Sequence, residues 1–342
     1  MRLGIITGGG DCPGLNAVIR AIVRSGIGVH GHTLLGFRDG WKGVIEDRAV
    51  DLDVSKVTGI LHRGGTILGS SGLNPMRVDG GEGAVRATFE ARELDGLIAI
   101  GGEGTLGAAA ELADRGLHVV GVPKTIDNDL AGTDITVGFH TAVQVATDAI
   151  DRLHSTAESH DRVMVVEVMG RNAGWIAIYS GLAGGADIIL IPEHPFDIDE
   201  VCRLLRRRHM HRSSFSIVVV AEGAIPLEGT LVLPEPETDE NGFPRLGGVV
   251  NHIAPEIERR TGFQTRVTIL GHVQRGGTPV AFDRVLATRM GLAAVDLATA
   301  GGWGRMVGRQ AQEIVDVPLR TAVEQRSVVP LELYREAEVF FG

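Results

Sequence analysis

Cysteine is scarce in this chain of 342 residues, which has only Cys12 and Cys202. Neither belongs to a CxxC pair or another metal-ligand spacing, so we expect a reducing compartment. No apolar run reaches the 18 residues of a membrane span, and the apolar run at the start of the chain is too short for a signal peptide. We therefore expect a cytoplasmic protein with no membrane partner.

An excess of positive charge is also missing. The chain has 33 lysines and arginines against 43 acids, a net charge of -10. This balance argues against nucleic-acid binding and favours a protein that handles cations such as Mg²⁺, with anions bound only at local basic spots. The 44% apolar content is enough for a full core, and the length allows two domains. No short-period repeat is visible.

Glycine, in contrast, is abundant, with 48 residues that cluster after apolar runs. The segments 8–14, 64–72 and 101–107 are the main clusters. A strand, a glycine-rich turn and a helix together form the layout of a phosphate cradle. The first cluster is not a P-loop because no GK[ST] follows, and alone it is equally compatible with a tight turn.

Hydrophobic periodicity predicts alternating strands and helices. The predicted strands are 2–7, 33–37, 94–100, 118–122, 163–168, 188–191, 216–221 and 266–270. The predicted helices are 15–25, 83–93, a helix from the 101–107 loop to 115, 139–157, 203–212, 248–260 and 284–300. We expect Pro123 to stop the strand before it, Asn172 to cap a helix, and 226–247 to be a surface loop or hairpin.

The segment 121–129 concentrates ionisable groups at a strand end. Lys124, Thr125, Asp127 and Asp129 follow the apolar run within six residues. In open α/β sheets, ligands bind at such strand ends. This pattern indicates chemistry in preference to packing, although Asx-turn formation is the structural alternative for both acids.

Together with Asp127, comparable side chains follow several predicted strands: Asp11, Glu103, Arg171, Glu222, His272 and Arg275. Their shared position predicts two doubly wound three-layer α/β/α domains with the active site in the cleft between them. Acids beside glycine cradles suggest a metal-bound polyphosphate, and arginines with a histidine suggest a second anion. The combination favours phosphoryl transfer to a hydroxyl of a phosphorylated acceptor.

A Rossmann-type dehydrogenase is the alternative from a different class. Gly102, Gly104 and Gly107 form GxGxxG, and Asp127 lies near the spacing of a ribose-binding acid. Glu103 inside that loop would repel a pyrophosphate unless a metal intervened. A non-catalytic sugar-phosphate sensor and the NAD or lipid kinases, which share a GGDGT-like loop, remain further alternatives.

Several long motifs occur in one order along the chain: GGGDCPGLNAVIR (8–20), RGGTILGS (63–70), GGEGT (101–105), PKTIDND (123–129), AIDRLHSTAESHDRVMVVEVMGR (149–171), AEG (221–223) and GHVQRGGTP (271–279). By these motifs the chain resembles the 6-phosphofructokinases over nearly its whole length, as an actinobacterial-type ATP-dependent member with mixed ATP-type and pyrophosphate-type motifs. The resemblance implies glycolytic phosphorylation of fructose 6-phosphate by ATP to fructose 1,6-bisphosphate.

The resemblance also implies roles for individual residues. Asp127 resembles the general base, Thr125 a group that holds the reacting end of the sugar, and Asp129 a support for the metal. Glu103 resembles a Mg²⁺-linked acid that is commonly Asp. The implied nucleotide contacts are Gly10, Gly102, Glu103, Gly104 and Thr105. The implied sugar-phosphate contacts are Thr125, Ile126, Asp127, Arg162, Met169, Gly170, Arg171, Glu222, Arg266, His272, Val273, Gln274 and Arg275, with Arg171 also near the transferred phosphoryl.

Arg162 and Arg266 resemble arginines that reach the sugar 6-phosphate of a neighbouring subunit. The resemblance therefore implies a homotetramer or homodimer with shared active sites. It also implies a larger nucleotide-binding domain of 1–138 plus 252–304, and a smaller sugar-phosphate-binding domain of 139–251 plus 305–342. Arg20 and Arg24 match effector-site arginines of bacterial relatives, but His154 and Val54 replace others, so the effectors stay open.

Two positions give opposite indications about the phosphoryl donor. Gly104 leaves room for the α-phosphate of ATP, where pyrophosphate users have Asp. Lys124 is typical of pyrophosphate users, but it can bind a terminal phosphate of either donor. We therefore expect ATP, with pyrophosphate as the alternative. Gly72 stands where many ATP users have a phosphate-holding arginine, and Lys124 is our candidate to replace that charge.

Overall fold

The computed structural model describes residues 1–342 apart from 211–214, 235–237 and 239–245. The chain forms two compact units. The first comprises Met1–Thr141 and Arg275–Ser327, and the second Ala142–Gln274 and Val328–Gly342. This division differs from the predicted ranges in two long segments. Residues 252–274 belong to the second unit because the strand Thr265–Ile269 pairs with Val163–Val168. Residues 305–327 belong to the first because the strand Arg305–Gln310 pairs with Val119–Thr125.

The first unit contains an eight-stranded mixed sheet in the order β12-β11-β5-β4-β1-β2-β3, with β6 paired to β5. Its strands are β1 (Arg2–Thr7), β2 (Thr33–Phe37), β3 (Ala49–Leu52), β4 (Gly96–Gly101), β5 (Val119–Thr125), β6 (Val137–Gly138), β11 (Arg305–Gln310) and β12 (Glu313–Pro318). The central strands β1, β4 and β5 are parallel and wholly apolar over most of their length, as expected for strands covered on both faces.

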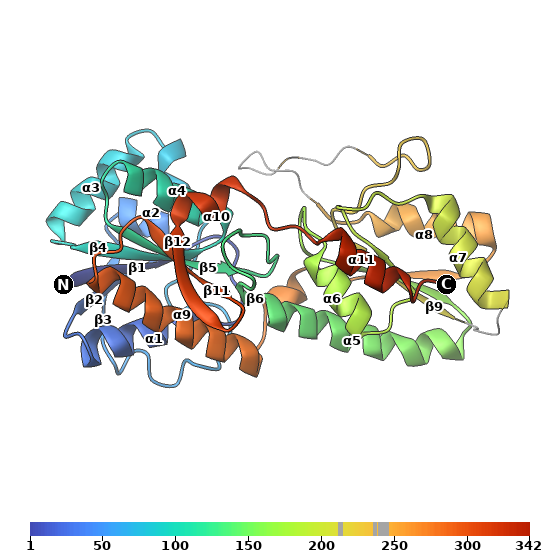
Figure 1. The fold of residues 1–342 in the computed structure, drawn as a ribbon, viewed down its shortest axis with the longest axis horizontal. Helices are drawn as coiled ribbons and strands as arrows, with labels where there is room; N and C mark the ends of the chain where they lie inside the picture. Colours follow the sequence, from blue (N-terminus) through green and yellow to red (C-terminus); the bar gives the residue numbers. More distant parts are fainter. Residues whose placement is uncertain (211–214, 235–237, 239–245) are drawn as a thin grey trace. The chain divides into compact units, whose positions relative to one another are not determined.

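Helices cover both faces of this sheet (Figure 1). They are α1 (Leu15–Gly28), α2 (Trp41–Ile45), α3 (Gly81–Ala91), α4 (Glu103–Asp114), α9 (Ala281–Thr299) and α10 (Leu319–Glu324), with a 3₁₀ turn η1 (Pro75–Arg77). α1 and α9 lie together on one face, and α3, α4 and α10 lie on the other. Alternate strand residues such as Ile6, Leu97 and Val119 belong to the hydrophobic core between the sheet and α3, α4 and α10. The first unit is therefore a three-layer α/β/α structure.

The second unit has a parallel four-stranded sheet in the order β10-β7-β9-β8. Its strands are β7 (Val163–Val168), β8 (Ile188–Leu190), β9 (Ser216–Ala221) and β10 (Thr265–Ile269). Its helical segments are α5 (Phe139–Ser159), which begins in the first unit, α6 (Trp175–Ala183), α7 (Ile198–Met210), α8 (Val250–Thr261), η2 (Gly271–Arg275), which ends in the first unit, and α11 (Leu331–Glu338). α7 and α8 pack on one face, and α6 lies on the other. The expected three-layer α/β/α architecture is thus confirmed for both units.

Pro123 lies inside β5, so the expectation that it stops the strand is wrong. The carbonyl of Val119 accepts a hydrogen bond from Gly304, on the side of the strand that β11 occupies. Successive residues of a strand direct their backbone N–H and C=O groups to alternate sides. Pro123, four residues after Val119, would therefore direct an N–H to the same side as the Val119 carbonyl. There β11 pairs with residues 120–121 and β6 with 124–125. The missing donor falls between the two partner strands, which is why proline is tolerated.

Asn172 does not cap the next helix. α6 begins at Trp175 after Gly174, whose N–H donates to both carboxylate oxygens of Glu193 at 2.9 and 3.0 Å. A side chain from a distant segment has thus replaced the local cap that sequence spacing suggested. The predicted hairpin at 226–247 lies partly outside the described residues, as does Arg212 of the predicted helix 203–212.

None of the helices in the part of the chain that the structure describes combines the length and apolarity needed to cross a membrane.

Candidate functional site

Three loops leave the carboxyl ends of neighbouring strands in the first unit. β5, β4 and β1 are adjacent and parallel, so the loops that follow them emerge at one edge of the sheet. These are the 125–129 loop, the turn at 102–105 and the glycine loop at 8–14. The sheet topology therefore brings the predicted acids, the predicted nucleotide turn and the first glycine cluster to one place. Ligand sites of doubly wound sheets lie at such strand ends.

Lys124 holds the glycine loop in place. Its side chain is buried within β5, and Nζ donates to the carbonyl of Gly8 at 2.9 Å and of Gly10 at 2.5 Å. Burial is the main cause that lowers the pKa of the ammonium below its ordinary value. The predicted donor-binding lysine thus has a structural task as well: it fixes two carbonyls at the start of the cradle.

The turn at 102–105 opens α4. Glu103 is the first helical residue and its side chain is 57% exposed. Thr105 is buried, and its hydroxyl lies against the backbone of Gly8. A Cβ placed on Gly104 would meet no atom within 4 Å. The chain itself therefore leaves the space beside Gly104 open, and its N–H groups lie at a helix N-terminus suited to an anion.

The 125–129 loop presents Asp127 in a fixed conformation. The N–H of Asp127 donates to Thr125 Oγ1 at 3.1 Å, and Asn128 takes a left-handed φ of 53°. The Asn128 side chain accepts from the N–H of Thr136 at 2.8 Å and donates to the carbonyl of Asp134 at 3.1 Å. Asp127 Oδ1 is buried and has no hydrogen-bond partner among the described residues. Such an orphaned acceptor is costly unless a ligand or cation satisfies it.

The acids of this edge repel one another. Burial, then the charge of Asp127 and more weakly that of Glu103, raises the pKa of Asp129 to about 7. Within the described ranges, no three His, Cys, Asp or Glu side chains are grouped as a complete metal cage. Mg²⁺ usually takes one or two carboxylates and fills its other positions with water and substrate phosphates. The acid group around the orphaned Asp127 oxygen fits such a cation.

In the second unit, the corresponding strand ends carry basic and main-chain groups. Met169, Gly170 and Arg171 follow β7, and Glu222 follows the neighbouring β9. Glu222 Oε1 accepts from the N–H of Arg171 at 2.9 Å and of Gly170 at 3.3 Å. Arg171 has a left-handed φ of 52°, a strained conformation for a non-glycine residue. The predicted sugar contact Glu222 therefore also shapes the backbone that presents Arg171.

The segment after β10 forms the short turn η2. His272 and Val273 are exposed there, whereas Gln274 is fully buried and its amide donates to the carbonyl of Gly271 at 3.1 Å. Gln274 is thus placed to hold the turn. Arg275 belongs to the first unit, where its guanidinium approaches the backbone of Gly10 and Asp11.

Arg162 and Arg266 lie at the opposite edge of the same sheet. Arg162 precedes β7, and Arg266 is the second residue of the adjacent parallel strand β10. At roughly 3.3 Å per residue, the seven steps from Arg162 to Met169 span about 23 Å. Arg266 pairs with Met164, five steps or about 17 Å before the level of Met169. This spacing separates Arg162 and Arg266 from the predicted sugar contacts Met169 and Arg171 at the other end of the same sheet.

The basic helix α7 does not form an open anion pocket from its described arginines. Arg203 pairs with Glu200, Arg206 donates to a carbonyl on α8, Arg207 donates to a carbonyl near the C-terminus, and Arg208 pairs with Asp187 at 3.0 Å. The solvated-face interpretation of this segment agrees with these contacts.

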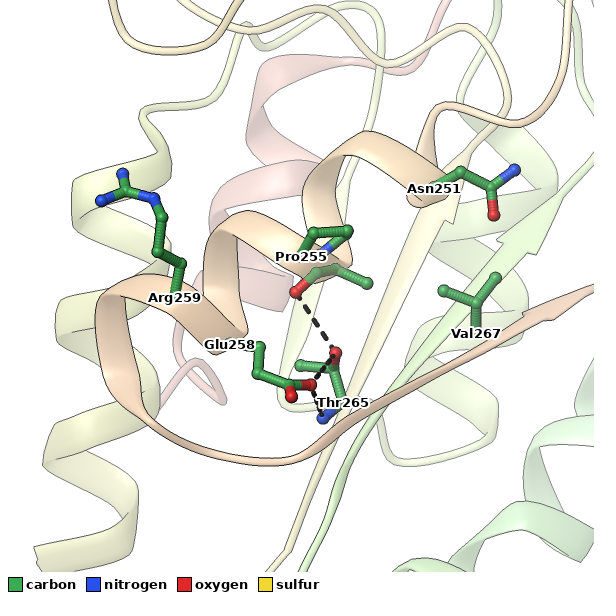
Figure 2. Close-up of a pocket in the computed structure, with 7 residues that line it drawn as sticks. Asn251, Pro255, Glu258, Arg259, Thr265 and Val267 are labelled. Carbon is green, nitrogen blue, oxygen red and sulfur yellow. Dashed lines mark hydrogen bonds between the residues drawn. The ribbon is translucent and has the colours of Figure 1, made fainter.

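A cavity of about 510 Å³ lies in the second unit between α8 and β10 (Figure 2). Glu258, one of its lining residues, accepts from the N–H and hydroxyl of Thr265 at 2.9 and 3.0 Å. None of the predicted site residues lines it. The cavity therefore gives no geometric support to the predicted ligand-binding residues.

Sequence reasoning missed the residues that hold the site. Asn128 and Thr136 fix the acid loop, and Glu193 fixes the start of α6. Arg326 lies with its Nη2 3.8 Å from Glu103 Oε2. Asn128 had a usable signal, since Asn tolerates the left-handed conformation between two acids. Thr136 lies eight residues beyond Asn128, whereas Glu193 and Arg326 are far along the chain from the groups they contact.

Comparison with known proteins gives a consistent family. The phosphofructokinase family model matches residues 2–298. A pyrophosphate–fructose 6-phosphate 1-phosphotransferase of Amycolatopsis methanolica is 56% identical over 342 residues, covering 100% of each chain. An ATP-dependent 6-phosphofructokinase of Mycobacterium leprae is 54% identical over 343 residues, again covering 100% of each chain.

A solved structure agrees. Phosphofructokinase from Pichia pastoris superposes with a TM-score of 0.83 and 32% identity, covering 99% of this chain and 37% of that one. The predicted strand-end acids, the glycine turns and the full-length similarity thus lead to one conclusion: this chain belongs to the phosphofructokinase family.

Proposed function

We propose that the chain transfers the terminal phosphoryl group of Mg-ATP to the C1 hydroxyl of fructose 6-phosphate, giving fructose 1,6-bisphosphate and ADP in glycolysis. The observation that carries the proposal concerns Asp127, at the carboxyl end of β5 beside the 102–105 turn. Its buried Oδ1 has no hydrogen-bond partner in the part of the chain that the structure describes. A carboxylate held there is poised as a base for a hydroxyl.

The reaction needs one proton transfer and one displacement. Asp127 accepts the proton of the C1 hydroxyl, whose oxygen forms a bond to the terminal phosphorus. The bond from that phosphorus to the bridging oxygen of ADP breaks, and ADP leaves. Thr125 holds the conformation of the base through the N–H of Asp127. Arg171 is proposed to neutralise negative charge on the transferred phosphoryl group.

Mg²⁺ is the proposed cofactor, with Glu103 as the proposed ligand and Asp129 as support. When bound, the metal would neutralise the charge of the donor phosphates. Burial, and then the charge of Asp127, raises the pKa of Asp129, and a cation at this edge would offset that cost of negative charge. Gly10, Gly102, Gly104 and Thr105 are the proposed contacts to the phosphates, through backbone N–H groups at the start of α4.

The acceptor is proposed to bind at the strand ends of the second unit. Met169, Gly170, Arg171 and Glu222 would contact the sugar, and His272 with Arg275 would contact the 6-phosphate. Ile126, Val273 and Gln274 remain proposed sugar-phosphate contacts in the same sense. Guanidinium groups suit phosphate because they bind two of its oxygens at once.

Arg162 and Arg266 support a shared active site. Their position at the amino ends of β7 and β10 sets them about 17–23 Å along the strands from the end that is proposed to bind the sugar. We therefore propose that they contact the 6-phosphate bound by a second copy, in a homotetramer or homodimer. Sedimentation with activity measurements across a dilution series tests this, because a lone protomer should be inactive.

The donor is proposed to be ATP because the space beside Gly104 is open. The relatives divide: names specifying pyrophosphate and names specifying ATP both occur at more than 50% identity over the full chain. Overall identity therefore does not choose the donor, and local geometry has to. An acid at position 104 would oppose the α-phosphate of ATP, whereas glycine leaves it room.

Pyrophosphate is the second candidate donor, favoured by Lys124. Lys124 donates to two carbonyls of the glycine loop, those of Gly8 and Gly10. Replacing it with Gly should leave these carbonyls unsatisfied, at a cost of about 1–3 kcal/mol, and lower kcat/KM by about tenfold or more with either donor. Unchanged kcat/KM and unfolding temperature would reject both its structural and its donor-binding role.

The decisive experiment is a coupled assay of fructose 1,6-bisphosphate formation at fixed Mg²⁺ with saturating fructose 6-phosphate. ATP and pyrophosphate are compared at equal concentrations, and kcat/KM is measured for each. A higher value with ATP supports the proposal. A higher value with pyrophosphate overturns the donor assignment while keeping the reaction class. If no fructose 1,6-bisphosphate forms with either ATP or pyrophosphate, the proposed function is wrong.

A further inference from the structure

Arg326 is brought to the acid edge of the first unit by backbone pairing. Leu130 and Arg326 form an antiparallel bridge, and the N–H of Ser327 donates to the carbonyl of Asp129 at 2.9 Å. Arg326 follows α10, so a late segment of the chain is fastened directly to the loop that carries Asp127 and Asp129. The position of its Cα therefore depends on the acid loop, whatever its side chain does.

The guanidinium of Arg326 points to the proposed metal ligand. Its Nη2 lies 3.8 Å from Glu103 Oε2, with the two side chains 41% and 57% exposed. An exposed pair at that distance contributes little to folding stability, typically 0–1 kcal/mol. It is also looser than the bidentate contacts near 2.8 Å that arginine makes with carboxylates elsewhere in this chain, such as Arg92 with Asp47.

The loose contact has a consequence for cation binding. Glu103 belongs to the same charged group as Asp127 and Asp129, and Lys124 is already committed to the carbonyls of Gly8 and Gly10. A hard divalent cation would bind carboxylate oxygens. It would therefore compete with Arg326 for Glu103, and a guanidinium held at 3.8 Å is easily displaced.

We propose that Arg326 is a resident counter-ion of Glu103 that a divalent cation must displace, and that it thereby sets the metal affinity of the site. The inference rests on the proposed function, because it takes Glu103 to be a metal ligand. Arg326 is a positioning and tuning residue here, not a catalytic one. Because the 129–130 and 326–327 backbones are paired, the displaced guanidinium stays beside the site.

The test measures metal binding without nucleotide or sugar. MgCl₂ is titrated into the full chain and into Arg326→Gln, with NaCl added to keep the ionic strength constant, and the unfolding temperature is followed. We expect the half-saturating Mg²⁺ concentration to fall by about two- to fivefold in Arg326→Gln, because a competing charge has gone. Arg326→Lys, which keeps the charge, should stay near the wild-type value.

Arg320→Gln is the matched control. Arg320 is an exposed arginine of the same unit that pairs with Asp114 and Glu324 on α4 and α10, away from Glu103. It should leave the half-saturating Mg²⁺ concentration unchanged. An equal shift in Arg320→Gln, no shift or a rise in Arg326→Gln, or no Mg²⁺ effect in any of the proteins would each overturn the inference.

The readout separates this inference from the proposed function. Enzyme that makes fructose 1,6-bisphosphate but shows equal Mg²⁺ affinity in wild type and Arg326→Gln would refute the role of Arg326 alone. A chain that shows the expected shift in Mg²⁺ affinity but phosphorylates no sugar would refute the proposed reaction and leave the counter-ion role intact.

Discussion

The strand ends of the two units differ in charge, although both units are α/β/α structures with parallel strands at their centres. In the first unit, burial, then the charge of Asp127 and more weakly that of Glu103, raises the pKa of Asp129 to about 7. In the second unit, Arg171 and His272 follow the strands, and the acid Glu222 accepts N–H groups of the backbone. The same sheet geometry therefore carries groups that suit a cation at one edge and groups that suit an anion at the other.

The difference also concerns how each edge is held. The first unit uses side chains on the cradle: Lys124 on the glycine loop and Asn128 in the acid loop. In the second unit, carboxylates accept hydrogen bonds from main-chain N–H groups: Glu222 from Arg171, and Glu193 from Gly174. Acids that are already satisfied by N–H groups add little repulsion to a phosphate, which is compatible with an anion site.

The largest expected effect removes the base from the acid edge. Asp127→Asn should lower kcat by on the order of 10²–10⁴, because the amide cannot accept the proton of the sugar hydroxyl. Steady-state kinetics with the better donor measure it. Asp79→Asn, at an exposed position of the same unit, is the control. A near-wild-type kcat in Asp127→Asn would end the assignment of the base.

The next effect adds an acid to the same edge. Gly104→Asp should lower kcat/KM for ATP by about 100-fold or more, since like charges placed together cost several kcal/mol. The open space at Gly104 predicts that the variant folds, which thermal unfolding checks. Gly104→Ala separates bulk from charge. Retained ATP use in Gly104→Asp would show that position 104 does not select the donor.

A smaller effect is expected where an acid holds the basic edge. Glu222→Ala removes the acceptor for the N–H groups of Gly170 and Arg171, so the strained backbone at Arg171 should relax. We expect a loss of about 1–3 kcal/mol of stability and a raised KM for fructose 6-phosphate. Denaturant unfolding and kinetics measure the two. If Glu222→Gln, which keeps an acceptor oxygen, behaves like Glu222→Ala, direct charge is what matters.

The smallest effect is a pH dependence of the acid edge. The pKa of Asp129 is about 7 in the folded chain against an ordinary 3.8, so its stabilising contribution is complete below 3.8 and is lost as pH rises through 7. Asp129→Asn should therefore lose less stability than wild type between pH 5 and pH 8. Thermal unfolding across that range, without metal, checks the sign.

Metal should oppose that pH effect. Protons and a divalent cation compete for the same carboxylates, so Mg²⁺ should stabilise wild type more at pH 8 than at pH 6. The difference should shrink in Asp129→Asn. Equal stabilisation at both pH values in the wild type would contradict the raised pKa of Asp129.

Local sequence pattern was a good guide where one physical effect dominates. The strands at Arg2–Thr7, Val163–Val168 and Ser216–Ala221 begin and end where the hydrophobic runs do, because they are buried on both faces. Strands β3, β11 and β12 were missed because exposed and charged residues interrupt their apolar pattern, and β12 lies at the sheet edge. Propensity and period carry little information there.

The sequence by itself determined the α/β class, the order of the motifs and the kind of chemistry, since each depends on residues that are neighbours along the chain. Only the tertiary structure decided that Pro123 continues β5, that Lys124 holds Gly8 and Gly10, and that Arg326 lies beside Glu103. The physical reason is the same for all three. In each case the neighbouring groups come from other segments of the chain. Their positions are set by the topology of the sheet, which no local sequence pattern records.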